Sequence, residues 1–329
     1  MSAQRLLPVD KQGPLHASRQ LLYHTWHHAD LDAMFIPAWE DEKSIPEPTL
    51  IQEPAHLERA DPFAPFIPDN AARFAIQVLD QHQGQRLGFA MRPCELLTFK
   101  ELARRKRLDT NSTLLISTDC LSASPESERH LRAEDDEEPQ NLTHEALQFA
   151  SEGGFLASPF RRSCQFCDLL MADDVDLHIG VLGLETSRHM LLMISNPELD
   201  QDLCSELSLL PKIPSDVDQH RQRILSNLSA WRRRTWNQAL SNLDRERSTF
   251  EALIAHLESC DACRDRLAMH CPLFHPSWCS PQSSLPMEDV IDWLRACTGC
   301  GTCEHPCPDG YPLIMTILSL RQRNGLRST

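Results

Sequence analysis

The sequence predicts an α/β region followed by a mainly α-helical region that is rich in cysteine. Between residues 21 and 200, short apolar runs alternate with amphipathic segments, the order typical of a sheet covered by helices. Beyond Asn196 the apolar residues recur at helical spacing, and eight of the 13 cysteines lie between Cys260 and Cys307. A chain of 329 residues can form two domains and bury sizeable cores.

Strands and helices are expected to alternate along the first region. Residues 1–20 are predicted to form a polar arm, and residues 121–150, which contain an acidic run, are predicted to form a solvated loop. Residues 46–68 are crowded with proline, which predicts an extended, irregular path. The predicted strands are 31–36, ended by Pro37, then 87–91, 114–116, 175–183 and 190–194, and the predicted helices run through 70–79 and 96–107.

The second region is expected to begin with a long helix. This helix starts near Ser215 and carries apolar residues such as Leu228 and Trp231 at helical spacing, which indicates a packed face. We place a boundary near residue 200. The predicted segments are an arm at 1–20, an α/β domain at 21–200, a helical connector at 201–255 and a helical domain at 256–329.

The composition argues against several functional classes. The chain has no run of about eighteen apolar residues and no apolar signal-peptide core, so we expect a cytoplasmic protein without membrane insertion. A formal net charge of −15 argues against nucleic acid, which would need a basic face, and suits docking to protein partners. Thirteen cysteines in a reducing compartment indicate metal binding rather than disulfides.

The last cysteines form a metal-binding motif. Residues 297–308 read C-x2-C-x2-C-x3-C-P, the run that holds a 4Fe-4S cluster in bacterial-type ferredoxins. The two-residue gaps let one tight loop aim three thiolates at three irons, and Gly299 and Gly301 let the backbone curl close to them. Zinc is the alternative, although zinc sites seldom use four cysteines at this density ending in Cys-Pro. The cysteines of the motif are Cys297, Cys300, Cys303 and Cys307.

An incomplete copy of this motif precedes it. Cys260-x2-Cys263-x7-Cys271-Pro272 lacks a third cysteine in the usual place, and Cys279 is the nearest substitute. Because the last cysteine of such a run serves the other cluster, we expect a crossover. One cluster is then held by Cys271, Cys297, Cys300 and Cys303, and the other by Cys260, Cys263, Cys307 and Cys279. Alternatively, His256-x3-Cys260-x2-Cys263 resembles the zinc-binding pattern of anti-sigma factors, whose zinc domain stands near the N-terminus of a regulator.

Four further cysteines lie in the α/β region. Cys94 and Cys120 each follow a predicted strand, at the edge where open α/β sheets place their sites. Cys164 and Cys167 form a C-x2-C pair, which by itself also fits zinc, a redox dithiol or chance. We expect these four cysteines to converge on one edge of the sheet. With the eight C-terminal cysteines they make three groups of four, and Cys204 belongs to none.

The residues around the four cysteines resemble a known family. The segments Met91-Arg-Pro-Cys-Glu-Leu96, Ser117-Thr-Asp-Cys120, Arg161-Arg-Ser-Cys-Gln-Phe-Cys167 and 175–183 look like the beta subunits of coenzyme F420-reducing hydrogenases and formate dehydrogenases. This likeness covers roughly residues 25–195. The C-terminal motif is similar to the ferredoxin segment that some members append, and to the helical ferredoxins of heterodisulfide reductase and fumarate reductase.

The resemblance implies an α/β fold that holds a 4Fe-4S cluster, with Cys94, Cys120, Cys164 and Cys167 as the matching ligands. It also implies a flavin, such as FAD, that exchanges electrons between clusters and a deazaflavin or nicotinamide. We therefore expect an electron-transfer subunit with two or three 4Fe-4S clusters, whose partner is the catalytic subunit of a dehydrogenase or hydrogenase complex. No side chain is expected to act as a catalytic acid or base. The alternatives are a zinc-binding structural or regulatory protein and a self-sufficient flavoenzyme.

Overall fold

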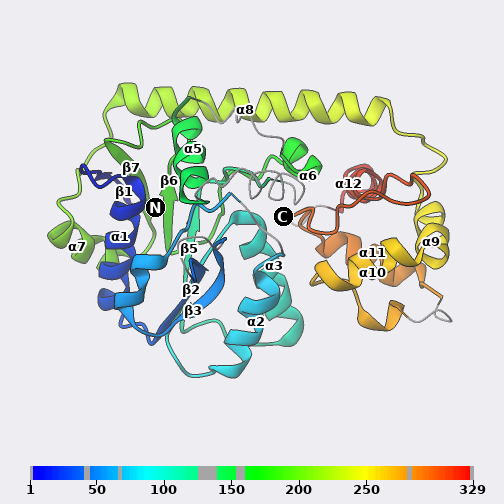
Figure 1. Cartoon of the computed structure of the whole chain (residues 1–329), viewed down its shortest axis with the longest axis horizontal. Helices are drawn as coiled ribbons and strands as arrows, with labels where there is room; N and C mark the ends of the chain where they lie inside the picture. Colours follow the sequence, from blue (N-terminus) through cyan, green and yellow to red (C-terminus); the bar gives the residue numbers. More distant parts are fainter. Residues whose placement is uncertain are drawn as a thin grey trace.

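A computed structural model describes residues 3–40, 45–65, 69–124, 139–152, 160–279 and 284–326. In these ranges the strands form one mixed sheet of seven strands in the order β1-β7-β6-β5-β4-β2-β3 (Figure 1). Strands β2, β4, β5 and β6 are parallel to one another. Strand β7 is antiparallel to β6 and to β1, and β3 is antiparallel to β2. The strands are β1 Ala3–Pro8, β2 Ala33–Ala38, β3 Glu47–Ile51, β4 Leu87–Met91, β5 Thr113–Thr118, β6 Leu177–Gly180 and β7 His189–Ile194.

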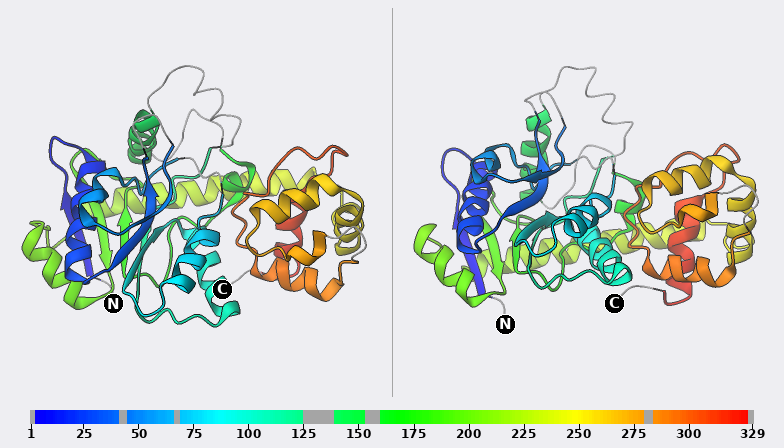
Figure 2. Two further views of the ribbon diagram at one scale, coloured as in Figure 1. Left: turned by 60° about the horizontal axis from the view of Figure 1, so that its bottom comes forward. Right: turned by 90° about the horizontal axis from the view of Figure 1, so that it is seen from below.

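Helices surround the sheet and continue beyond it. The α-helices are α1 Pro14–His28, α2 Ala72–Gln81, α3 Pro93–Lys106, α5 Pro139–Glu152, α6 Arg162–Phe166, α7 Pro197–Glu206, α8 Ser215–Ser241, α9 Phe250–Ser259, α10 Asp261–His270, α11 Met287–Ala296 and α12 Leu313–Arg323. Short 3-10 helices occupy Pro54–Arg59 and Pro276–Cys279. We call residues 3–206 the sheet region and residues 250–323 the helical region. Helix α8 joins the two and runs across the sheet region, and α9 to α12 gather beyond α3 and α6 (Figures 1 and 2).

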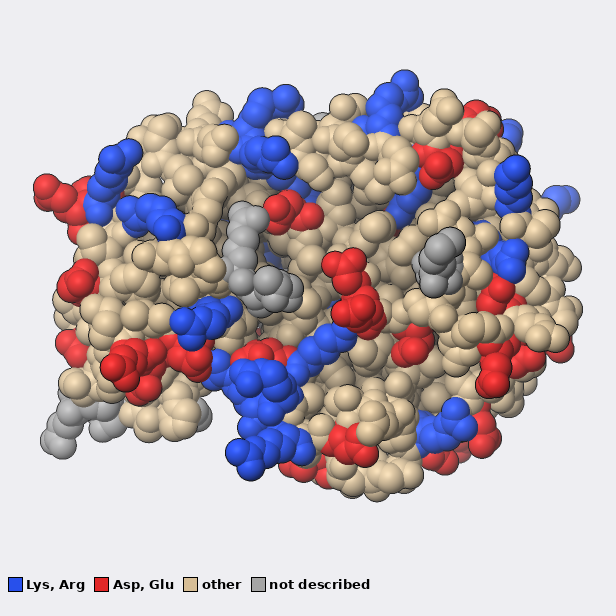
Figure 3. All heavy atoms as spheres, turned by 180° about the vertical axis from the view of Figure 1, so that it is seen from behind, with Lys and Arg blue, Asp and Glu red and all other residues tan. Residues whose placement is uncertain are grey.

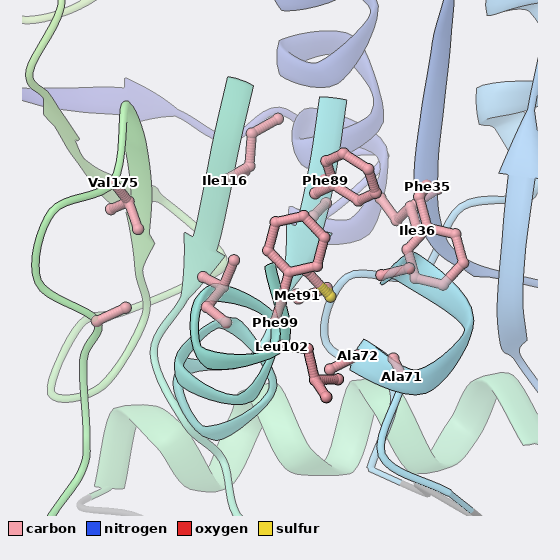
Figure 4. Packing of buried hydrophobic residues seen from close by; sticks show 14 of the residues in the cluster. Phe35, Ile36, Ala71, Ala72, Phe89, Met91, Phe99, Leu102, Ile116 and Val175 are labelled. Carbon is pink, nitrogen blue, oxygen red and sulfur yellow. The ribbon is translucent and has the colours of Figure 1, made fainter. Parts of the chain in front are cut away.

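The centre of the sheet is apolar because its parallel strands are covered on both faces. Every residue of β4 is buried, as expected for an inner parallel strand. The ring of Phe89 on this strand lies 6.0 Å from that of Phe35 on β2 and 4.7 Å from that of Phe99 on α3 (Figure 4). Helix α3 begins directly after β4, where the Glu95 carboxylate accepts a hydrogen bond of 3.0 Å from the backbone N–H of Arg92. Cys94, the residue after Pro93, is therefore held at the edge of the sheet.

The predicted strands at 87–91 and 190–194 are confirmed, but three local predictions are wrong. Of residues 1–20, predicted to be a polar arm, Ala3–Pro8 form β1 and Pro14 begins α1, because β1 pairs with β7 and buries Leu6 and Leu7. Within the predicted loop at 121–150, residues 139–150 belong to α5, which buries Leu147. Strand β2 passes through Pro37, whose ring is tolerated opposite Pro48 on β3. The acidic run at 134–138 lies outside the described residues.

Most buried apolar residues of both regions belong to one contiguous cluster, so the division into separate domains stays a prediction. No helix in the described part of the chain is both long and apolar enough to cross a membrane. On the face seen in Figure 3, basic side chains are interspersed with acidic ones instead of forming one continuous basic surface.

Candidate metal centres

The first candidate centre lies at the edge of the sheet. Cys94 is the second residue of α3, Cys120 follows β5 by two residues, Cys164 lies in α6 and Cys167 ends it. Burial raises the pKa of the Cys94 thiol, and the nearby thiols of Cys120 and Cys167 raise it further. Burial likewise raises the pKa of Cys167 to about 12, with contributions from Cys120 and Cys164. The structure thus brings together four thiols from three separate segments, which we call the sheet-edge set.

A buried ion pair holds the segment that carries Cys120. The Asp119 carboxylate accepts hydrogen bonds from the backbone N–H groups of Val181 (2.7 Å) and Leu182 (2.8 Å), and from the Arg221 guanidinium at 2.7 and 3.0 Å. Burial alone would raise the pKa of Asp119, but the Arg221 charge outweighs it and holds that pKa well below its usual range. Helix α8 is in this way tied to the end of β5.

A second arginine of α8 supports the other side of the sheet-edge set. Arg232 donates to the backbone carbonyl of Cys167 at 2.6 Å and to the Ser122 hydroxyl at 2.9 Å. The sequence does not identify Arg221 and Arg232 as supporting residues, because both lie on α8, within the helical connector predicted at 201–255. At helical spacing, both arginines share a face with Leu228, and this face is predicted to be packed. That shared face is the sequence pattern that could identify them.

The second candidate centre lies in the helical region and combines the two C-terminal motifs. Burial, with contributions from Cys297 and Cys300, raises the pKa of Cys271 to about 12. Burial also raises the pKa of the Cys303 thiol, and the nearby thiols of Cys271, Cys300 and Cys297 raise it further. Cys271 ends α10, while the other three lie on the loop after α11, where Gly299 has a φ of 74°. The structure therefore brings together the four cysteines of the expected crossover, which we call the crossed set.

The sheet-edge set and the crossed set are neighbours. The Cys300 thiol is close enough to Cys94 to contribute to the raised pKa of Cys94. The hydroxyls of Thr98 on α3 and Thr298 in the C-terminal motif lie 3.0 Å apart. Gly301 packs so closely on α6 that a Cβ atom at this position would lie 1.8 Å from the Ser163 hydroxyl oxygen. The loops that carry the two sets are thus in direct contact, on the boundary between the sheet region and the helical region.

The remaining cysteines form a third group that includes a histidine. The donor atoms of His256, Cys260, Cys263 and Cys307 all lie within 4.8 Å of one another. We call these residues the compact set. Among them are three of the four residues expected for the second ferredoxin cluster. The side chain of the fourth, Cys279, lies outside the described residues.

A small cavity adjoins the two neighbouring sets. It has a volume of about 150 Å³ and is lined by residues of α3, α6, α8 and α12, together with Cys167, Thr298 and Gly299. Pockets that enclose cofactors or drug-sized ligands usually measure roughly 300–1,000 Å³. This cavity is too small for a flavin dinucleotide.

The chain matches no protein-family model. Among solved structures, a chain of the xenon-derivatised F420-reducing [NiFe] hydrogenase complex from Methanosarcina barkeri is similar, with a TM-score of 0.50 and 10% sequence identity. The similarity covers 72% of this chain and 91% of that chain. At this identity the likeness shows a shared fold, and the mixed α/β fold class predicted from the sequence is confirmed.

Proposed function

We propose that this chain is an iron-sulfur electron-transfer subunit of an oxidoreductase complex. In this proposal the sheet-edge set holds one 4Fe-4S cluster and the crossed set holds a second. When bound, such clusters carry single electrons. The observation that carries the proposal is the direct contact between the segments that bear the two sets, where the Thr98 and Thr298 hydroxyls lie 3.0 Å apart and Gly301 packs on Ser163.

The surroundings of the thiols fit cluster ligands. The thiols of Cys167 and Cys271 are buried among other thiols, and a bound cluster would take them as thiolates with release of their protons. Backbone N–H groups also donate to the sulfurs, that of Leu169 to Cys167 and that of Gly299 to Cys297. Hydrogen bonds of this kind stabilise thiolates and tune the reduction potential of a cluster.

The proposed partner is another subunit of an oxidoreductase complex of hydrogenase or formate dehydrogenase type, in the cytoplasm. The solved chain of similar fold belongs to a hydrogenase complex, which supports this choice. The FAD that the family resemblance implies has no site assigned in this proposal. The chain's own residues then bind and insulate the clusters and carry out no acid–base step.

Anaerobic purification followed by iron, acid-labile sulfide and flavin analysis tests the proposal. We expect about eight irons and eight sulfides per chain, two cubanes of four, and a visible absorbance that dithionite bleaches reversibly. A chain that holds stoichiometric zinc and no acid-labile sulfide would contradict the proposal. A tightly bound flavin, with turnover of a small substrate by the isolated chain, would favour the self-sufficient flavoenzyme instead.

A further inference from the structure

The compact set differs in geometry from the two neighbouring sets. The Nε2 atom of His256 lies 3.2 Å from the Cys263 sulfur and 3.6 Å from the Cys307 sulfur, and the sulfurs of Cys260 and Cys307 lie 4.0 Å apart. Across the described residues, no other group of three or more histidine, cysteine or acidic side chains has all its donor atoms within 4.8 Å. The sheet-edge set and the crossed set are therefore more open.

These distances fit one ion. Zinc binds sulfur at about 2.3 Å and nitrogen at about 2.0–2.1 Å, so the ligand atoms of a tetrahedral site lie about 3.5–3.8 Å apart. The thiolates of a cubane each bind a different iron, and the body of the cluster keeps them farther apart. The donors are also one imidazole and three thiols, a combination typical of structural zinc sites.

The local structure holds these four donors in place. His256 lies on α9, Cys260 stands at the junction of α9 and α10, and Cys263 lies in the first turn of α10. The His256 ring stacks on the Tyr311 ring, with the ring centres 3.9 Å apart, and the Tyr311 hydroxyl donates to the Arg247 carbonyl at 2.9 Å. The imidazole is thereby fixed with Nε2 toward the sulfurs.

We propose that His256, Cys260, Cys263 and Cys307 bind one zinc ion in a closed tetrahedral site that is structural rather than redox-active. The ion ties the α9–α10 junction to the loop before α12, whose preceding cysteine, Cys303, belongs to the crossed set. Because zinc carries no electrons, the electron route ends at the crossed set and does not extend to the far side of the helical region. The zinc site itself concerns residues that neither neighbouring set uses, whereas the end of the electron route rests on the proposed function.

Metal analysis of variants separates the two kinds of site. We expect one zinc per chain in the protein purified anaerobically and washed with a chelator. Cys263→Ser should lose the zinc and keep the iron, whereas Cys303→Ser should lose about four irons and keep the zinc. Cys204→Ser is the matched control, because this thiol belongs to none of the three sets, interacts with Asp200 and Arg5 and should affect neither metal.

A spectroscopic arm covers the case in which Cys263→Ser does not fold. Exchange of the zinc for Co²⁺ in the parent protein should produce the thiolate-to-cobalt charge-transfer and tetrahedral d–d bands of a three-sulfur, one-nitrogen site. His256→Cys should retain zinc, and its Co²⁺ bands should shift as the nitrogen ligand is replaced by sulfur. A parent protein without zinc, zinc that survives Cys263→Ser, or loss of iron and sulfide in Cys263→Ser would each overturn the inference.

Discussion

The sheet region and the helical region are held together in different ways. The sheet region is held by long-range strand pairing and by the buried strand β4, where the tilted rings of Phe35, Phe89 and Phe99 pack together. In the helical region, α9 to α12 have only 10 or 11 residues each, a length that is marginal for an isolated helix in water. The joins between these helices carry the crossed set and the compact set. The two regions therefore differ: the sheet region is held by apolar packing, whereas the helical region adds two candidate metal sites to an apolar core that includes Phe274, Trp278 and Trp293.

The largest expected effect is the loss of a metal ligand in the helical region. We expect Cys303→Ser to lower the protection of backbone amides in α11 and α12, whose join carries Cys303, by more than about 5 kcal/mol, because structural metal contributes about 10 kcal/mol or more to folding. The α9–α10 junction, held by the proposed zinc ion, should stay protected. The amides of β4 and β5 should keep their protection. Hydrogen exchange on the variant, alongside its iron content, measures both, and Cys204→Ser serves as the control.

The helical region also contains a cluster of Phe274, Trp278 and Trp293, with ring centres 5.0 and 5.3 Å apart in the two pairs that include Phe274. This cluster is the competing source of stability. If Cys303→Ser loses a full cluster of irons while α11 and α12 stay as protected as in the parent, then aromatic packing holds the region and the contrast with the sheet region fails.

The next largest effect should come from the core of the sheet region. Phe89 is fully buried, so Phe89→Ala should destabilise β4 and β5 by about 3–5 kcal/mol through lost burial and the cavity left behind. Phe74 on α2 is 41% exposed, and Phe74→Ala should change stability by less than about 0.5 kcal/mol. Hydrogen exchange in β4 and β5 gives both values. If Phe89→Ala and Phe74→Ala lower the protection of β4 and β5 equally, then burial of Phe89 does not stabilise the sheet region more than an exposed ring does, and the contrast with the helical region fails.

The smallest effect concerns the contact between the regions. Gly301 has a φ of 73° and packs on Ser163, whereas Gly310 has a φ of 64° and no atom within 4 Å of the place where a Cβ would lie. Both alanine substitutions strain the backbone, but only Gly301→Ala adds a collision, which should cost about 1–3 kcal/mol more. Thermal unfolding compares the two variants.

A second substitution tests whether the collision is the cause. Ser163→Gly removes the two atoms with which a Cβ at position 301 would collide, so adding Gly301→Ala to Ser163→Gly should cost no more than Gly310→Ala costs in the parent. If Gly301→Ala and Gly310→Ala are equally stable from the start, then the two loops are not pressed together and the neighbouring sets are less tightly joined than the structure indicates.

Local patterns in the sequence predict much of the sheet but little of what completes its edges. The apolar run Leu87–Met91 predicts β4 because a parallel strand that is buried on both faces is apolar throughout. This pattern can be recognised without knowing which strands lie beside it. The segment Ala3–Pro8 looks polar, and it becomes a strand because β7, over 180 residues later in the sequence, offers a free edge. Such a pairing is set by tertiary structure and leaves no local signal.

Local spacing predicts some of the candidate metal ligands, while others depend on the tertiary structure. Spacing alone predicts the motif that begins at Cys297, and the crossover rule predicts that Cys271 joins it. The sequence cannot decide between His256 and Cys279 as the companion of Cys260, because both lie within reach along the chain. Arg221 reaches Asp119 across 102 positions, so its role depends on how α8 packs against the sheet.

Electron paramagnetic resonance of the protein reduced with dithionite tests the central claim most directly. If the sheet-edge set and the crossed set hold two clusters side by side, the reduced parent should give a spectrum broadened by magnetic coupling between them. Cys120→Ser and Cys303→Ser should each leave the simpler spectrum of one uncoupled cluster. A parent spectrum that equals the plain sum of the two variant spectra would contradict the claim that the clusters are neighbours, and a parent without any cluster signal would contradict the account as a whole.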